Sequence, residues 1–158
     1  MLDPTVPSPA NDFHSRHIGL MLDSYRELLG RPLLSPLPGQ SWGEAAFNAE
    51  FVLLSHTADA DPLFNYANRQ ALALFEFEWS ELVGLPSRFS AEPVNRAERE
   101  RLLSQVSSRG YIDDYSGVRI AKSGKRFLIE HAVVWNVYDQ WRRYYGQAAC
   151  FSDWRLLP

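Results

Sequence analysis

Cysteine and long apolar runs are scarce in this sequence of 158 residues, and each scarcity excludes a class of protein. Cys150 is the only cysteine, so neither an internal disulfide nor a cysteine-rich zinc site can form. No stretch reaches the roughly 18 to 20 apolar residues that a membrane span requires. The N-terminus lacks the basic and apolar regions of a secretory signal. We therefore expect a cytoplasmic protein that does not enter a membrane.

Basic residues are also fewer than acidic ones. Lysine and arginine number 16 against 19 acidic residues, which gives a formal net charge of -3, and Lys122 and Lys125 are the only lysines. A chain without a basic excess is not expected to bind nucleic acid directly. The sequence contains none of the motifs GxGxxG, GxSxG or HExxH and no Walker loop, so we do not expect an enzyme.

The positions of proline and glycine divide the sequence into three parts. Residues 1–10 hold three prolines and are predicted to form a disordered tail. Residues 11–43 contain a predicted helix that Gly30 ends, followed by a connector rich in proline and glycine. Residues 44–158 form the predicted compact domain.

The predicted N-terminal helix has an apolar stripe that must pack against another surface. This stripe can pack on its own domain or on a second copy of the chain. Its residues are therefore also our candidates for a homodimer interface: Ile18, Leu22, Tyr25 and Leu29.

The compact domain alternates between strand and helix signals. Two strands are predicted at 51–56 and 64–67, after which Asn68 caps a helix that reaches Phe75. A charged helix is predicted from Pro93 to about Arg109, with Gly110 closing it. Three more strands follow, joined by turns, at 115–121, 126–137 and 144–154. Consecutive hairpins favour an α+β fold in which an antiparallel sheet carries short helices on one face.

This element order is the order of a PAS domain. Residues 64–68 (FNYAN) resemble the segment through which a PAS strand enters its first helix. Residues 151–154 (FSDW) resemble the end of the last PAS strand.

A closer resemblance is to the MEKHLA domain, a PAS-related family with small stand-alone bacterial members and plant homeodomain-zipper members. The resemblance to the bacterial members rests on residues 63–75, 85–93, 117–120 and 124–127. It covers about residues 15 to 155 and implies a sensory or protein-interaction role. The resemblance supplies no catalytic residue, and it leaves any cofactor unknown.

His131 is the most prominent candidate for a ligand contact. Strict alternation along residues 126–137 places it on one face with Ile129 and Val133. From that position it could bond a ligand or a haem iron, or it could be an ordinary core or edge histidine. The candidates for lining a pocket between helices and sheet are Phe75, Phe89, Val106, Tyr115, Ile129, His131, Val133 and Phe151.

The remaining candidate groups indicate no chemistry of their own. His14 and His17 lie three residues apart on the first helix, where we expect a solvated face and no metal site. Cys150 falls on a strand, outside any Asn-Cys-Arg-Phe motif of the kind that light-sensing PAS domains use. We expect it to be a small buried thiol.

Three hypotheses follow from the sequence. The first is a signalling module that binds a small apolar ligand or cofactor and passes the signal to a separate protein partner. The second is a ligand-free homodimer or protein-interaction module that uses the first helix and the exposed face of the sheet. The third is a small enzyme on a cone-shaped α+β fold with His131 or an aspartate as base.

Overall fold

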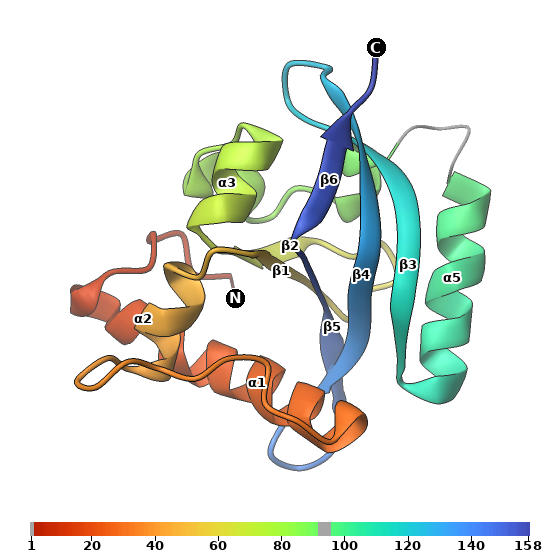
Figure 1. Ribbon diagram of the computed structural model, residues 1–158. Coiled ribbons are helices and arrows are strands. Elements are labelled where there is room, and N and C mark those ends of the chain that lie inside the picture. The colour runs from red at the N-terminus through yellow and green to blue at the C-terminus, as the bar shows by residue number, and fades with distance from the viewer. Residues whose placement is uncertain (1, 92–95) are drawn as a thin grey trace.

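Within residues 2–91 and 96–158, which the computed structural model describes, six antiparallel strands form one sheet (Figure 1). The strands are β1 (Val52–Thr57), β2 (Phe64–Ala67), β3 (Tyr111–Ile120), β4 (Arg126–Tyr138), β5 (Tyr144–Phe151) and β6 (Asp153–Leu156). The order β2-β1-β5-β4-β3 places the first hairpin beside the last strands, and β6 pairs with the first part of β4. The predicted α+β class with an antiparallel sheet is confirmed.

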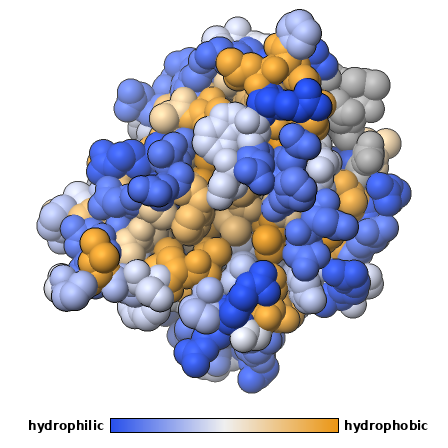
Figure 2. Space-filling view, in the orientation of Figure 1, coloured by the Kyte–Doolittle hydropathy of each residue, from blue (hydrophilic) through white to orange (hydrophobic). Residues whose placement is uncertain are grey.

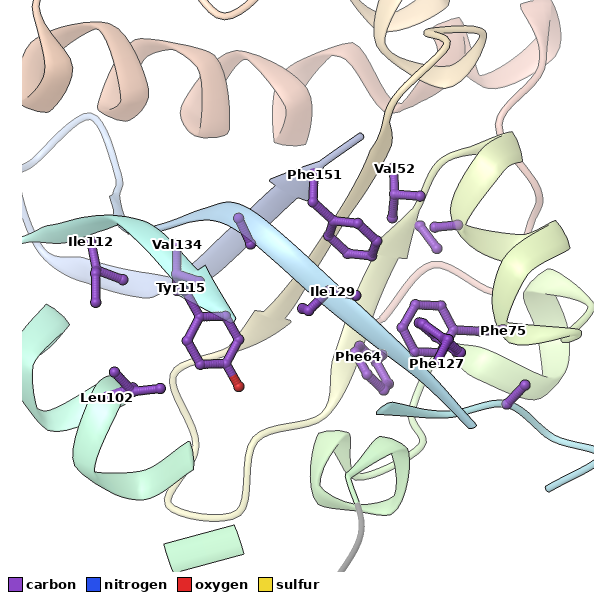
Figure 3. Close-up of a cluster of buried hydrophobic side chains, with 14 of the residues drawn as sticks. Val52, Phe64, Phe75, Leu102, Ile112, Tyr115, Phe127, Ile129, Val134 and Phe151 are labelled. Carbon is purple, nitrogen blue, oxygen red and sulfur yellow. The ribbon is translucent and has the colours of Figure 1, made fainter. Parts of the chain in front are cut away.

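Helices that follow β2 cover the inner face of the sheet. They are α3 (Arg69–Phe75), α4 (Trp79–Leu82), the 3-10 turn η2 (Ser87–Ser90) and α5 (Arg96–Arg109). Figure 3 shows the core beneath them, with Leu102 and Tyr115 at the α5 end and Phe75 and Phe127 at the other. Gly110 ends α5 with a φ of 94°, a value that glycine adopts without strain. The predicted start of this helix at Pro93 lies outside the described residues.

The opposite, outer face is covered by the N-terminal part of the chain. Its elements are the 3-10 segment η1 (Pro9–His14), α1 (Ser15–Leu29) and α2 (Trp42–Phe47). Ile18, Leu22 and Tyr25 are buried in a second core that contains Trp135 of β4. Trp135 donates its indole N–H to the Met21 carbonyl at 3.0 Å and meets the Tyr25 ring edge-on at 4.9 Å. The apolar stripe of α1 therefore packs on the chain's own sheet.

Residues before α1 also contact the domain. The carbonyl of Asp3 accepts the indole N–H of Trp79 at 3.1 Å, and the ring of His14 lies 5.0 Å from that indole. The three-part division at residues 10 and 43, with a disordered tail, stays a prediction.

Asn68 holds together more than the helix it was predicted to cap. Its Oδ1 accepts the Ala71 N–H at 3.0 Å, which confirms the cap, and also accepts the Leu53 N–H at 3.1 Å. Its Nδ2 donates to the carbonyls of Ala46 at 3.1 Å and Phe51 at 2.8 Å. One fully buried side chain thus joins α3, β1 and α2.

A bulge in β4 breaks the alternation that the sequence predicts. Opposite β3, Tyr115 pairs with Ala132 and Gly117 pairs with Ile129, so Glu130 and His131 together face one residue. His131 adopts a φ of 55°, which is uncommon for a residue with a side chain. As a result Ile129 and Ala132 face the inner core while Val133 faces the outer core, and the expected shared face is not formed.

Candidate functional site

The inner face of the sheet encloses a small cavity beneath η2 and α5. Its volume is about 70 Å³, and a further space of about 30 Å³ adjoins it along α5. Apolar side chains make most of the wall. They include Phe64, Phe75, Leu103, Ile129, Val134 and Phe151.

A row of polar side chains crosses three central strands at one end of this cavity. Gln147 of β5 lies directly opposite His56 of β1 on one side and Asn136 of β4 on the other. His56 and Gln147 line the cavity. Opposed residues of antiparallel strands have Cβ atoms about 4.5 to 5.5 Å apart, so these three side chains are near neighbours.

The hydrogen bonds of this row set the direction of both amides. Asn136 Nδ2 donates to the Val106 carbonyl at 3.1 Å, and a carbonyl can only accept. Asn136 Oδ1 therefore faces Gln147, whose Nε2 donates to it at 3.0 Å. This leaves Gln147 Oε1 buried without a hydrogen-bond partner among the described residues.

His56 is neutral at physiological pH. Burial lowers its pKa to about 4 despite its contacts with the Thr57 carbonyl and Gln147, and Arg99 adds to the lowering. Its Nδ1 lies 3.0 Å from the Thr57 carbonyl, and the neutral tautomer with its proton on Nδ1 satisfies that carbonyl. In that tautomer Nε2 carries a lone pair and donates nothing to Gln147.

Basic and hydroxyl groups line the other side of the cavity. Arg99 of α5 donates Nη2–H to Ser87 Oγ at 2.8 Å. Arg119 of β3 donates to the Tyr115 hydroxyl and, at 3.0 Å, to the Val118 carbonyl. Ser90 Oγ donates to the Ser87 carbonyl at 2.8 Å. Among the described residues that line the cavity there is no aspartate or glutamate.

On the outer face, the row of residues next to the polar row holds α1. Ser55, Ala148 and Trp135 lie side by side on β1, β5 and β4. Nε2 of His17 lies 2.9 Å from Ser55 Oγ, and its Nδ1 lies 3.0 Å from the Tyr145 hydroxyl. Burial lowers the pKa of His17 to about 4. The prediction of a solvated face for His17 is therefore wrong, because the helix turns this residue toward the sheet.

The structure places five of the eight predicted pocket residues around the cavity or the space that adjoins it. Phe75, Tyr115, Ile129 and Phe151 line the cavity, and Val106 lines the adjoining space. The other three lie elsewhere. Phe89 is 51% exposed, Val133 packs in the outer core and His131 points to solvent.

His131 forms an exposed pair with an acidic residue. Its Nδ1 lies 3.2 Å from Asp153 Oδ2, and its side chain is 76% exposed. Neither residue lines the cavity. A histidine and a carboxylate on open strands do not enclose a substrate, so this pair lends no support to the enzymatic hypothesis.

The polar lining of the cavity was not predicted from the sequence. His56 and Gln147 carry no motif, although each lies two residues from an inward-facing apolar residue, Leu54 and Ala149. That alternation could have placed both on the inner face. Arg99 and Ser87 lie on segments whose inward faces the pattern does not reveal.

A sheet of order β2-β1-β5-β4-β3 with helices between β2 and β3 defines the PAS class of folds, and solved structures agree. The PAS domain of a protein from Colwellia psychrerythraea superposes with a TM-score of 0.60 at 14% identity, over 72% of this chain and 91% of that one. The light-state dimer of the fungal blue-light photoreceptor Vivid gives 0.56 at 15% identity, over 82% and 91%.

The family is more specific than the fold. The model of the MEKHLA domain family matches residues 15–156, so this chain belongs to the MEKHLA family. It is also 24% identical over 157 residues to the homeobox-leucine zipper protein HOX9 of rice, Oryza sativa subspecies indica and japonica. The alignment covers 98% of this chain and 17% of the length of those relatives.

The cavity is too small for a flavin or a haem. Pockets for ligands of that size have volumes of about 300 Å³ or more, whereas the phenyl rings of Phe75, Phe127 and Phe151 fill this core. Cys150 is buried on the outer side of β5, as expected, and burial raises the pKa of its thiol to about 12. Such a thiol is not poised to form an adduct.

The described parts of the chain contain neither a candidate metal site nor a candidate membrane span. Within residues 2–91 and 96–158, no cluster of three histidine, cysteine or acidic side chains could hold a metal ion. None of the helices in these ranges combines the length and apolar character that crossing a bilayer demands.

Proposed function

We propose that this domain is a sensory module. A small ligand enters the inner cavity, changes the docking of α1 on the outer face, and so signals to a protein partner. The observation that carries this proposal is the position of two residue rows on the same strands. In the first row His56 and Gln147 line the cavity and Asn136 bonds Gln147 beside it, while the next row, Ser55, Ala148 and Trp135, contacts the α1 layer.

The two rows are neighbours on the same three strands, so the path from the cavity to α1 is short. A change of twist at residues 55 and 56 alters the Ser55 contact of His17 and the inner contact of His56 together. At the other end of the row, Asn136 bonds the Val106 carbonyl, which links the cavity to α5. Packed layers shift between discrete arrangements, so small changes at a ligand can move a docked helix.

Xenon is a suitable probe, because it enters small apolar cavities without needing a polar partner. We expect xenon to shift the amide resonances of the cavity strands and also the indole N–H of Trp135 beneath α1. Ala149→Leu fills the cavity and should abolish both sets of shifts, whereas Ala60→Leu on an exposed turn should preserve them. Shifts confined to the cavity lining would contradict the proposed link to α1.

A second candidate is a ligand-free homodimer, and exposed aromatic residues favour it. Trp141, Tyr144 and Tyr145 project from the β4–β5 hairpin. The surface seen from the side of Figure 1 also mixes hydrophobic areas with hydrophilic ones (Figure 2). The α1 stripe is buried, so an interface through Ile18 or Leu22 would require that helix to leave the sheet. Sedimentation equilibrium of the intact chain and of Trp141→Ser tests this candidate, which a monomer at high concentration would exclude.

A further inference from the structure

The polar groups of the inner cavity present two complementary sets of hydrogen-bonding atoms. Arg99, Arg119 and the Ser87 hydroxyl lie on one side and can donate to a ligand. Two positive charges with no carboxylate among the described lining residues favour a negatively charged ligand group. Arg99 keeps its own protein contacts, and a ligand anion would join them.

The other set consists of an acceptor that the protein leaves unsatisfied. Within the part of the chain that the structure describes, Gln147 Oε1 has no hydrogen-bond partner, and the Asn136–Val106 chain prevents the amide from turning its Nε2 into that place. In the tautomer that donates from Nδ1 to the Thr57 carbonyl, the neutral His56 beside it offers only a second acceptor. A buried acceptor without a donor destabilises the protein, so this position favours a ligand that brings an O–H or N–H.

The volume of the cavity limits the ligand to a few atoms. An apolar cavity of about 150 Å³ binds benzene, which has six non-hydrogen atoms. The two adjoining spaces, of about 70 and 30 Å³, therefore hold roughly four or five. The apolar wall formed by Ile129, Val134 and Phe151 accepts the carbon part of such a molecule.

We propose that the cavity binds a short 2-hydroxycarboxylate, of which glycolate is the smallest. The carboxylate accepts hydrogen bonds from Arg99, Arg119 and Ser87, while the hydroxyl donates to Gln147 Oε1. This inference rests on the proposed sensory function and names the ligand class for the same cavity.

A probe series on the unmodified chain tests the ligand class without any risk of misfolding. The probes are glycolate, acetate, which lacks the hydroxyl, and ethylene glycol, which lacks the charge. A ligand of this size binds no tighter than about micromolar, so the titration should extend into the millimolar range. We expect amide shifts at His56 and Gln147 with glycolate, about tenfold weaker binding of acetate, and none for ethylene glycol.

Variants then assign the two ends of the ligand. Gln147→Leu should remove the preference for glycolate over acetate, and Arg99→Gln should weaken both acids by about tenfold. Arg143→Gln removes an arginine from the exposed β4–β5 hairpin and should leave the affinities unchanged. Urea unfolding of each variant shows whether it is folded.

The outcomes separate the ligand class from the sensory function. Equal binding of glycolate and acetate to the unmodified chain would overturn the role of Gln147. Binding of xenon without binding of any carboxylate would overturn the ligand class and leave the sensory module standing. If neither xenon nor a carboxylate binds, both proposals are wrong.

Discussion

Ser55 and His56 are neighbours in β1 and face opposite layers of the protein. The Ser55 hydroxyl contacts His17 of α1, 38 residues earlier in the chain, while His56 lines the inner cavity. Strand geometry imposes this division, because successive side chains point to opposite faces of a sheet. One peptide unit therefore joins the layer that binds in our proposal to the layer that responds.

His17 and His56, which lie on the two faces of β1, should make the stability of the fold depend on pH. Burial lowers their pKa values from 6.5 to about 4, so between these values the unfolded chain binds protons that the folded chain does not. Stability is then full above pH 6.5 and is lost as the pH falls toward 4, by on the order of 3 kcal/mol per histidine. Urea unfolding at pH 7, 5.5 and 4 measures this loss.

Single variants assign the loss to its source. His17→Gln and His56→Gln should each flatten the pH profile relative to the unmodified chain, since glutamine does not titrate. His131→Gln alters an exposed histidine and should leave the profile unchanged. Parallel profiles for all four proteins would show that the buried histidines are not responsible.

Asn68 should be among the least replaceable polar residues. Asn68→Asp keeps the acceptor for Ala71 but directs a carboxylate oxygen at the carbonyls of Ala46 and Phe51. Both carbonyls would lose the donor that Asn68 supplies, and a charge would be buried among acceptors, so we expect a loss of about 3 kcal/mol or more in unfolding free energy.

The matched control for this variant is Asn48→Asp at the exposed end of α2. Asn48 Oδ1 accepts a hydrogen bond from Arg69, and a carboxylate can still do so. We expect a change within about 0.5 kcal/mol there. Equal effects at the two positions, measured by urea unfolding, would contradict the bridging role of Asn68.

Tyr66 should tolerate the loss of its hydroxyl. The residue is fully buried, and its hydroxyl has no hydrogen-bond partner in the described ranges 2–91 and 96–158. Tyr66→Phe removes this unsatisfied group, so we expect unchanged or slightly higher stability. Tyr115→Phe also removes a buried hydroxyl, but this one bonds Arg119, and we expect it to cost about 1 kcal/mol. Thermal unfolding of the two variants compares them directly, and a larger loss for Tyr66→Phe would show that its hydroxyl has a partner.

The sequence predicts the fold well because the fold depends on local and periodic signals. Asn68 as a cap, Gly110 as a helix end and the turns of the last hairpins are each determined by neighbouring residues. The layer to which α1 packs could not be predicted, since an apolar stripe such as Ile18 to Tyr25 does not identify the surface that covers it.

The residues that line the cavity were harder to predict than the fold, and the bulge in β4 is a main reason. Strict alternation brings His131 inward, whereas one extra residue at Glu130 and His131 turns it to solvent and moves Val133 to the outer core. No residue type near position 131 predicts a positive φ there. Arg99 and Gln147 meet only through tertiary packing, which no spacing in the sequence reveals.

The strained backbone at His131 leads to a last prediction. A φ of 55° costs a residue with a Cβ roughly 1 kcal/mol relative to glycine. His131→Gly should therefore leave stability unchanged or raise it by up to about 1 kcal/mol, after the loss of an exposed contact with Asp153. His131→Val places a β-branched residue at the same φ and should lower stability by about 1 to 2 kcal/mol. Since His131 lies outside the cavity, both variants should keep the xenon shifts of the unmodified chain. Urea unfolding measures the change in stability, and the xenon titration measures binding to the cavity. A loss of the xenon response in folded His131→Gly would show that His131 contributes to the binding site.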